Sequence, residues 1–238
     1  HTLAAAIDSA DLVYLAFFDE DAREVMGDFN RASELSLLHC DSDVTRLERW
    51  NRPVLPISEF SNVAKQLGGI SVKSSSDGTV RYYQAVSALS NGVEASKAVA
   101  NFPVYMMLDA KNIPLSEVVV TKRGLQYADS LLVPLSDDGS FRLNWLGNQE
   151  KFRYISYYKV WDELMPAEFF EGKYVFLGAS ASGLQDLKTV PSRDDKMAGV
   201  EVHATAFLNL MNGAYLNEPD AYQIRLVYLL LAFIMILI

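Results

Sequence analysis

The sequence predicts an α/β domain with a mixed or mostly parallel sheet flanked by helices, followed by the start of a C-terminal transmembrane helix. Three observations support this fold class. Short apolar runs, such as residues 12–17 and 174–177, are typical of strands that are buried on both faces. Stretches with apolar residues at helical spacing, such as residues 199–211, alternate with such runs. Every residue in 226–238 is apolar.

Composition and charge limit the class of protein. Half of the 238 residues are hydrophobic, which excludes disorder over the whole chain and allows a large core. The net charge of −9 and the lack of a basic patch argue against nucleic acid as a partner, because phosphate binding needs clustered cations. The single cysteine, Cys40, cannot form an internal disulfide.

The first half of the chain alternates between apolar periodic segments and polar turns. Carboxylates are frequent in residues 19–54, which favours a solvated surface over a metal or cation site. Spacing and turn residues predict a helix at 2–10, a strand at 12–17, a helix at 60–67 ended by Gly68 and Gly69, and a strand from Val80 after the turn at 74–78.

The second half predicts more strands. A helix is expected at 96–108, with a kink or a late start at Pro103 because proline lacks the backbone N–H. The Asp-Asp-Gly turn at 137–139 predicts a hairpin between strands at 130–135 and 141–145. The remaining elements are a strand at 116–121, a helix that Ser156 can cap, a strand at 174–177 between Gly172 and Gly178, and a helix from Gly199 that Asn212 and Gly213 end.

One stretch, residues 172–216, resembles the C-terminal signature of the CHASE family, type two, the cyclase- and histidine-kinase-associated sensory extracellular domain. Two family prolines are absent, at Ser182 and Ala198, which weakens expectations about rigid loop geometry but not about the fold. The matching residues are Gly172, Lys173, Gly178, Ala179, Ser180, Gly183, Leu184, Asp186, Gly199, Val200, Glu201, Val202, His203, Ala204, Asn209, Leu210, Gly213 and Leu216.

The resemblance implies a domain organisation and a location. Residues 1–217 would form the sensory domain, without its usual first strand–helix unit, on the extracytoplasmic side of the cell membrane. Residues 218–238 would be a linker and the beginning of a transmembrane helix. The apolar run 226–238 could instead be a buried C-terminal helix; because it has no polar face, the membrane interpretation is preferred.

The resemblance also implies a function. The domain would be the input module of a longer signalling protein, controlling a cytoplasmic nucleotide cyclase, which makes cAMP, or a histidine or serine/threonine kinase. The chain itself would not be an enzyme and would need no cofactor. A homodimer is expected because such output modules work in pairs. The stimulus, a small molecule or a physical signal, is not named by the sequence.

Apart from the resemblance, the residue types themselves indicate one polar cluster: Asp186, Glu201 and His203. A carboxylate and a neutral imidazole could bind a ligand or metal, or titrate near neutral pH. The plainer interpretation is that Asp186 sets a turn, Glu201 favours a helix N-terminus and His203 packs in the core. No catalytic motif is present, and Gly178–Gly183 lacks the lysine of a phosphate-binding loop.

Three functional hypotheses follow from these residues. The preferred one is a sensory input domain. The second is a membrane-anchored α/β enzyme, or a metal- or small-ligand-binding module centred on Asp186, Glu201 and His203. The third is an assembly domain that pairs two output modules without sensing anything.

Overall fold

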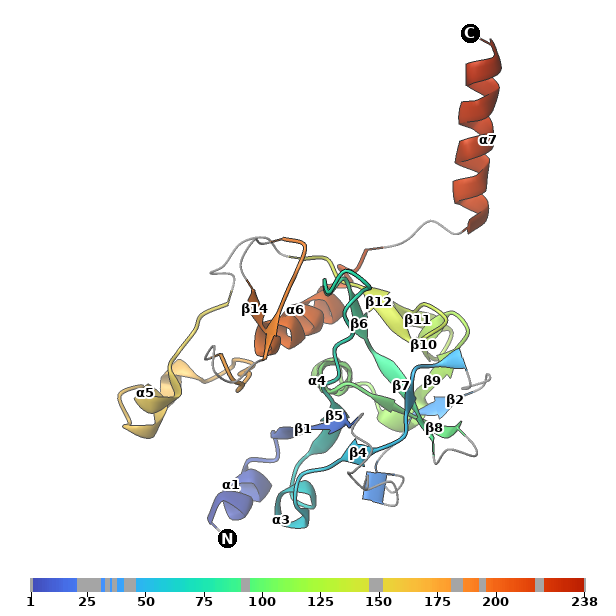
Figure 1. Ribbon diagram of the computed structural model, residues 1–238. Helices are drawn as coiled ribbons and strands as arrows, with labels where there is room; N and C mark the ends of the chain where they lie inside the picture. The colour runs from blue at the N-terminus through green and yellow to red at the C-terminus, as the bar shows by residue number, and fades with distance from the viewer. Residues whose placement is uncertain are drawn as a thin grey trace.

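The computed structural model (Figure 1) describes residues 2–20, 31–32, 35, 38–40, 46–90, 95–145, 152–180, 186–192, 196–216 and 221–237. Its helices are α1 (Thr2–Ala10), α3 (Ser58–Ser61), α4 (Phe102–Ala110), α5 (Tyr157–Trp161), α6 (Gly199–Asn212) and α7 (Ala221–Leu237), with single 3₁₀ turns at Leu115–Glu117 and Ala167–Phe169. Its strands are β1 (Tyr14–Asp19), β2 (His39–Cys40), β3 (Arg49–Trp50), β4 (Pro53–Val54), β5 (Gln66–Gly69), β6 (Tyr82–Gln84), β7 (Val86–Ser90), β8 (Ala95–Ala100), β9 (Val118–Thr121), β10 (Gly124–Tyr127), β11 (Ser130–Pro134), β12 (Ser140–Arg142), β13 (Leu187–Lys188) and β14 (Met197–Ala198).

The described strands form small mixed sheets, as the mixed α/β prediction expected. Their orders are β4-β1-β5, β11-β10-β9-β2 and β3-β7-β8, with two-stranded pairs β12-β6 and β13-β14. The pairs β1/β5, β2/β9 and β3/β7 are parallel, and the others are antiparallel. Parallel pairing needs a crossover between the strands, which explains why partners lie far apart in the sequence.

Helix α4 lies at the centre of the larger hydrophobic core, and α6 packs beside it (Figure 1). The start of α4 crosses β5 at Gly68, where an added Cβ would lie 2.4 Å from the Cα of Phe102. Only a residue without a Cβ allows the strand and the helix to approach this closely. The elements β1, β5, α4 and α6 therefore form one packed unit, although they lie far apart in the sequence.

Several predicted elements are confirmed. The helix at 2–10 is α1, and the strand predicted at 12–17 is β1, displaced by two residues. The helix from Gly199 is α6, and Gly213 ends it in the left-handed conformation with φ of 61°. Pro103 does mark a late helix start, because α4 begins at Phe102.

Four other predictions are wrong, and in each the tertiary partner overrides the local pattern. The helix expected at 60–67 is only the single turn α3, Ser58–Ser61, and its last two residues, 66 and 67, belong to β5, which pairs with β1. The first half of the helix expected at 96–108 is β8, paired with β7. The 137–139 turn forms, but β12 pairs with β6 and not with β11; the partner of β11 is β10, which the sequence did not indicate.

The strand predicted at 174–177 is the fourth. The chain there is irregular, and Val175 and Leu177 are exposed. The aromatic side chains that alternate with Val175 and Leu177 pack against α6 instead. The ring centroids of Tyr174 and Phe176 lie 4.6 and 5.7 Å from that of Phe207. Contact with a helix has replaced strand pairing at this segment.

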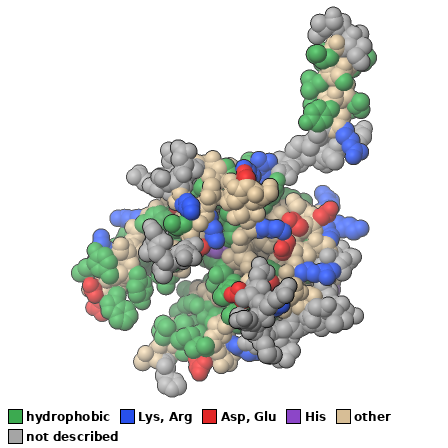
Figure 2. All heavy atoms as spheres, in the orientation of Figure 1, with side chains coloured by type: hydrophobic (Ala, Val, Ile, Leu, Met, Phe, Trp, Pro, Cys, Tyr) green, Lys and Arg blue, Asp and Glu red, His purple; other side chains and the backbone are tan. Residues whose placement is uncertain are grey.

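Helix α7 stands apart from the rest of the described chain (Figure 1), and hydrophobic side chains cover it in Figure 2. It has 17 residues. Among the described residues, no helix has both the length and the hydropathy needed to cross a membrane.

Candidate functional site

The N-terminus of α6 is built on Asp186. A short hairpin, β13 with β14, brings Asp186 back to Gly199, whose backbone N–H donates to the Asp186 carbonyl at 2.9 Å. A Cβ added to Gly199 would lie 2.3 Å from the Asp186 carboxylate, so this close contact between the carboxylate and the helix backbone requires glycine unless the carboxylate moves. The carboxylate also lies 3.4 Å from the ammonium of Lys188. A negative charge beside a helix N-terminus is favourable, and this explains why the signature pairs an aspartate with a glycine.

His203 is a core residue of α6. It is 8% exposed, and its Nδ1 lies 2.7 Å from the hydroxyl of the fully buried Tyr83. Burial raises the pKa of the Tyr83 hydroxyl well above its ordinary value, so this hydroxyl stays protonated and donates to Nδ1 in the neutral tautomer that carries its proton on Nε2. The Tyr83 and Phe102 rings pack against the imidazole, with centroids at 5.6 and 5.1 Å.

The environment of His203 disfavours its charged form. Burial, with a smaller contribution from the positive charge of Lys188, lowers the pKa of His203 to about 4. An imidazole with this pKa is neutral near pH 7 and accepts the Tyr83 hydrogen bond there. This geometry matches the interpretation of His203 as a packed core histidine better than a proton sensor working near neutrality.

Glu201 points elsewhere. It is 6% exposed, and its Oε2 accepts a hydrogen bond from the Tyr154 hydroxyl at 2.6 Å. Glu201 and His203 thus contact different elements, as their two-residue spacing on a helix requires. Within the described ranges, no group of three or more His, Cys, Asp or Glu side chains is placed to hold a metal ion. The structure therefore does not assemble Asp186, Glu201 and His203 into a metal centre.

Other signature residues position α6. Gly178 lies against Val200, where an added Cβ would be 2.6 Å from the Val200 Cβ. The fully buried Asn209 accepts from the backbone N–H of Asn144 at 2.8 Å and donates to its carbonyl at 3.1 Å. The amide of Asn209 thereby supplies a backbone-like partner for the chain two residues after β12.

The remaining signature residues surround this helix or lie outside the described part. Val202, Ala204 and Leu210 are buried in α6, and Leu216 donates its N–H to the Arg142 carbonyl at 3.1 Å. The Lys173 ammonium donates to the Phe169 carbonyl, Gly172 has a φ of 67°, Ala179 is half-buried and Ser180 is exposed. Ser182, Gly183 and Leu184 lie outside the described residues.

A second site, which the sequence did not indicate, is a cavity of about 300 Å³ where β1 and β5 end. Asp19 is the last residue of β1, and Ser71, Val72 and Lys73 follow β5. Because β1 and β5 are parallel, their carboxyl ends share one edge, which is where open α/β sheets bind ligands. The lining residues are Asp19, Glu48, Arg49, Trp50, Ser71, Val72, Lys73 and Gln84.

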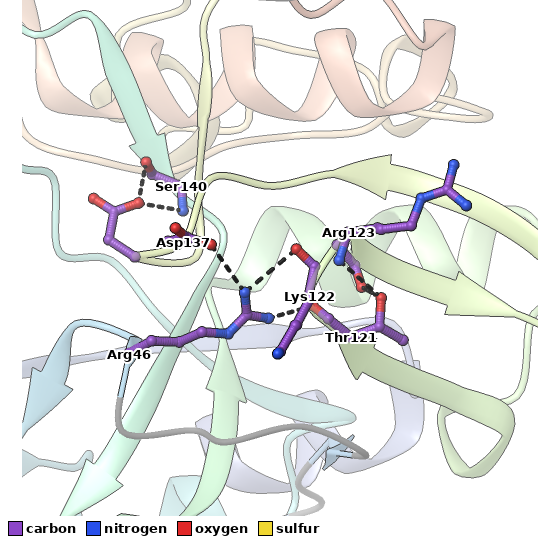
Figure 3. A network of polar contacts seen from close by, with 8 residues as sticks. Arg46, Thr121, Lys122, Arg123, Asp137 and Ser140 are labelled. Atoms are coloured by element: carbon purple, nitrogen blue, oxygen red, sulfur yellow. Dashed lines mark hydrogen bonds and ion pairs between the residues drawn. The ribbon is translucent and has the colours of Figure 1, made fainter. Parts of the chain in front are cut away.

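A network of polar contacts around Arg46 (Figure 3) holds the turn that contacts two of the lining residues, Glu48 and Gln84. The guanidinium of Arg46 donates to the carbonyls of Thr121 and Lys122 and pairs with Asp137 at 3.2 Å. These contacts hold the 136–139 turn against the sheet. The next carbonyl, that of Asp138, accepts from the Glu48 backbone at 3.1 Å and from the Gln84 amide at 2.6 Å. Glu48 and Gln84, two of the lining residues, are thus held in place before any ligand arrives.

The fold and these sites define an α/β domain with a polar cavity, in which the described signature residues shape and position α6. Comparison with protein-family models gives a match to the CHASE2 domain over residues 1–238. The chain belongs to the CHASE2 family, a family of extracellular sensory domains of signalling proteins. No curated protein and no solved structure matches the chain.

Proposed function

We propose that residues 1–217 are the extracytoplasmic input domain of a membrane-bound signalling protein, and that residues 218–238 begin a transmembrane helix. The input would control a cytoplasmic nucleotide cyclase or a kinase. Membership of the CHASE2 family carries this proposal. The exposed apolar side chains of α7, including Leu229 and Met235, support it, because an isolated apolar helix needs a non-aqueous or protein environment.

The route from the domain to α7 runs through the end of α6. After Gly213 ends the helix, the Tyr215 hydroxyl donates to the Leu132 carbonyl at 3.0 Å, and Leu216 is bonded to Arg142. The chain that leads to α7 is therefore attached to both β11 and β12. A stimulus that favours one arrangement of these strands would shift the position of α7, which is a population shift transmitted as a displacement.

We further propose that two such chains pair. Exposed apolar side chains gather on α5, among them Tyr157, Tyr158 and Trp161, the last with 74% of its surface exposed (Figure 2). Contiguous apolar surface of this kind is typical of protein–protein contact sites. A pair of input domains would bring two output modules together, as a cyclase or kinase requires.

Single-cysteine labelling tests the location. In the parent protein made free of other cysteines, with Cys40→Ser, a cysteine is introduced at the exposed Asp129 in the turn between β10 and β11. An extracytoplasmic domain reacts with a membrane-impermeant maleimide in cells whose outer membrane has been permeabilised and whose inner membrane is intact. Reaction only after the inner membrane is permeabilised would contradict the proposal.

Output measurements on the same parent protein test the function. Cyclic nucleotide formation and phosphorylation are measured in membrane vesicles with the domain present and with residues 1–216 deleted. A sensor gives an output that responds to conditions on the domain side and loses this response on deletion. An output that falls on deletion but never responds to any condition would favour the assembly domain.

A further inference from the structure

We propose that the cavity at the carboxyl ends of β1 and β5 binds a small α-amino acid, with Arg49 as the anchor for its carboxylate. The proposal gives a ligand class to the input domain and rests on the proposed sensory function for its purpose, though not for the binding itself. Four features carry it: the free cation, the acidic partners, the size and floor of the cavity, and its connection to α6.

Arg49 is the cation that is available to a ligand. The other cation, Lys73, is 2.6 Å from the Glu48 carboxylate, and the hydrogen bond to Glu48 raises the pKa of Lys73. In the described part of the chain, the Arg49 guanidinium makes no ion pair or hydrogen bond, although it borders the cavity. A guanidinium recognises a carboxylate through two parallel N–H···O bonds, which makes Arg49 a fitting carboxylate anchor.

The acidic side of the cavity favours a zwitterion over a simple anion. Asp19 and Glu48 balance Arg49 and Lys73, so the four charges sum to zero. The Glu48 carboxylate has more acceptor positions than its contact to Lys73, at 2.6 Å, requires, so it can accept from a ligand ammonium. The chain as a whole carries a charge of −9, which repels a ligand with a net negative charge.

The cavity is small and has a rigid floor. A volume of about 300 Å³ lies at the lower end of the range for small-molecule pockets, which suits an amino acid. Trp50 is buried and packs edge-on against Phe17, with centroids at 5.3 Å. A Cβ on Gly69 would lie 2.1 Å from the Trp50 ring, so the indole is held against the strand and gives the ligand a fixed apolar surface.

The cavity is connected to α6 through a single strand. Gln84 lines the cavity, and its neighbour on β6, Tyr83, points to the other face of that strand. There the Tyr83 hydroxyl bonds to His203 on α6. A ligand that shifts β6 at Gln84 therefore acts on the contact that positions α6, and α6 leads to α7.

Isothermal titration calorimetry with the 238-residue chain tests the proposal. The ligands are glycine, L-alanine, L-serine and the other standard L-amino acids, with acetate and succinate as anion probes. At least one amino acid is expected to bind more tightly than either anion. Arg49→Ala should weaken that binding roughly tenfold or more, as loss of a bidentate contact does, and Arg49→Lys should weaken it by less. The matched control is Arg123→Ala, because Arg123 is also exposed but lies in the β9–β10 turn (Figure 3) and does not line the cavity.

The outcomes separate cleanly. Arg49 is exposed, so its removal should leave the melting temperature of the chain unchanged, and a loss of binding then reports the site. The proposal is overturned if no amino acid binds, if only acetate or succinate binds, or if the Arg49 and Arg123 variants bind equally. Binding without any change of output in the parent protein would refute the sensory function and leave the site intact.

Discussion

Acidification should destabilise this domain through His203. In the folded chain the pKa of His203 is lowered to about 4, whereas an unfolded chain has a histidine near 6.5. Between these values the unfolded state binds a proton that the folded state does not. The stability contributed by a neutral His203 is therefore fully present above pH 6.5 and is lost as the pH falls toward 4.

The size of the effect follows from the difference of the two pKa values. A shift of this size corresponds to roughly 3 kcal/mol of unfolding free energy once the pH is below about 4. This loss is a large share of the free energy of unfolding of a typical domain, which is about 5–15 kcal/mol. Most of the loss should appear between pH 6.5 and 4, because the unfolded histidine titrates first.

Urea unfolding at pH 7.5, 6, 5 and 4.5 measures this loss. Two variants isolate His203 from the carboxylates that titrate in the same range. His203→Asn keeps an acceptor near the Nδ1 position for Tyr83 and removes the titration, so its stability should depend less on pH. Lys188→Gln removes the positive charge that helps lower the pKa, so it should also flatten the profile. Equal pH slopes in the wild type and both variants would refute the reasoning.

Two further substitutions test how α6 is held. Gly199→Ala should cost about 1 kcal/mol because its Cβ displaces the Asp186 carboxylate from the start of α6, and Asp186→Ala in the same chain should restore part of this loss in urea unfolding; additive losses would contradict the contact. Asn209→Ala should cost about 3 kcal/mol because it leaves the buried N–H and carbonyl of Asn144 unpaired, whereas Asn62→Ala at an exposed position should change the urea midpoint little. Equal midpoints for the Asn209 and Asn62 variants would show that the amide does not hold β12.

What the sequence could predict was local. The helix from Gly199 to Asn212 was recognisable because its apolar spacing and its stop at Gly213 lie within one short stretch. Residues 174–177 show the opposite case: a strand exists only with a partner, and this apolar run packs against Phe207 in place of one. Residues 66–69 became β5 for the same reason, since the parallel partner β1 lies far away in the chain.

The candidate sites were likewise predictable only where they depend on local sequence. Asp186 as a turn residue and His203 as a core residue were plausible from spacing, but their partners, Gly199 and Tyr83, could be identified only in three dimensions. The cavity could not be predicted at all. Its charged residues come from the end of β1, from β3 and from the loop after β5, and the carboxylates of residues 19–54 were interpreted as solvated surface.

The hydrogen bond from the Leu216 N–H to the Arg142 carbonyl fixes the place where the chain leaves the sheets, and this affects the orientation of α7. An α-helix turns by about 100° and rises by about 1.5 Å per residue. One residue inserted at the start of α7 would therefore turn the rest of that helix by about 100°, so a different side of α7 would face a neighbouring helix.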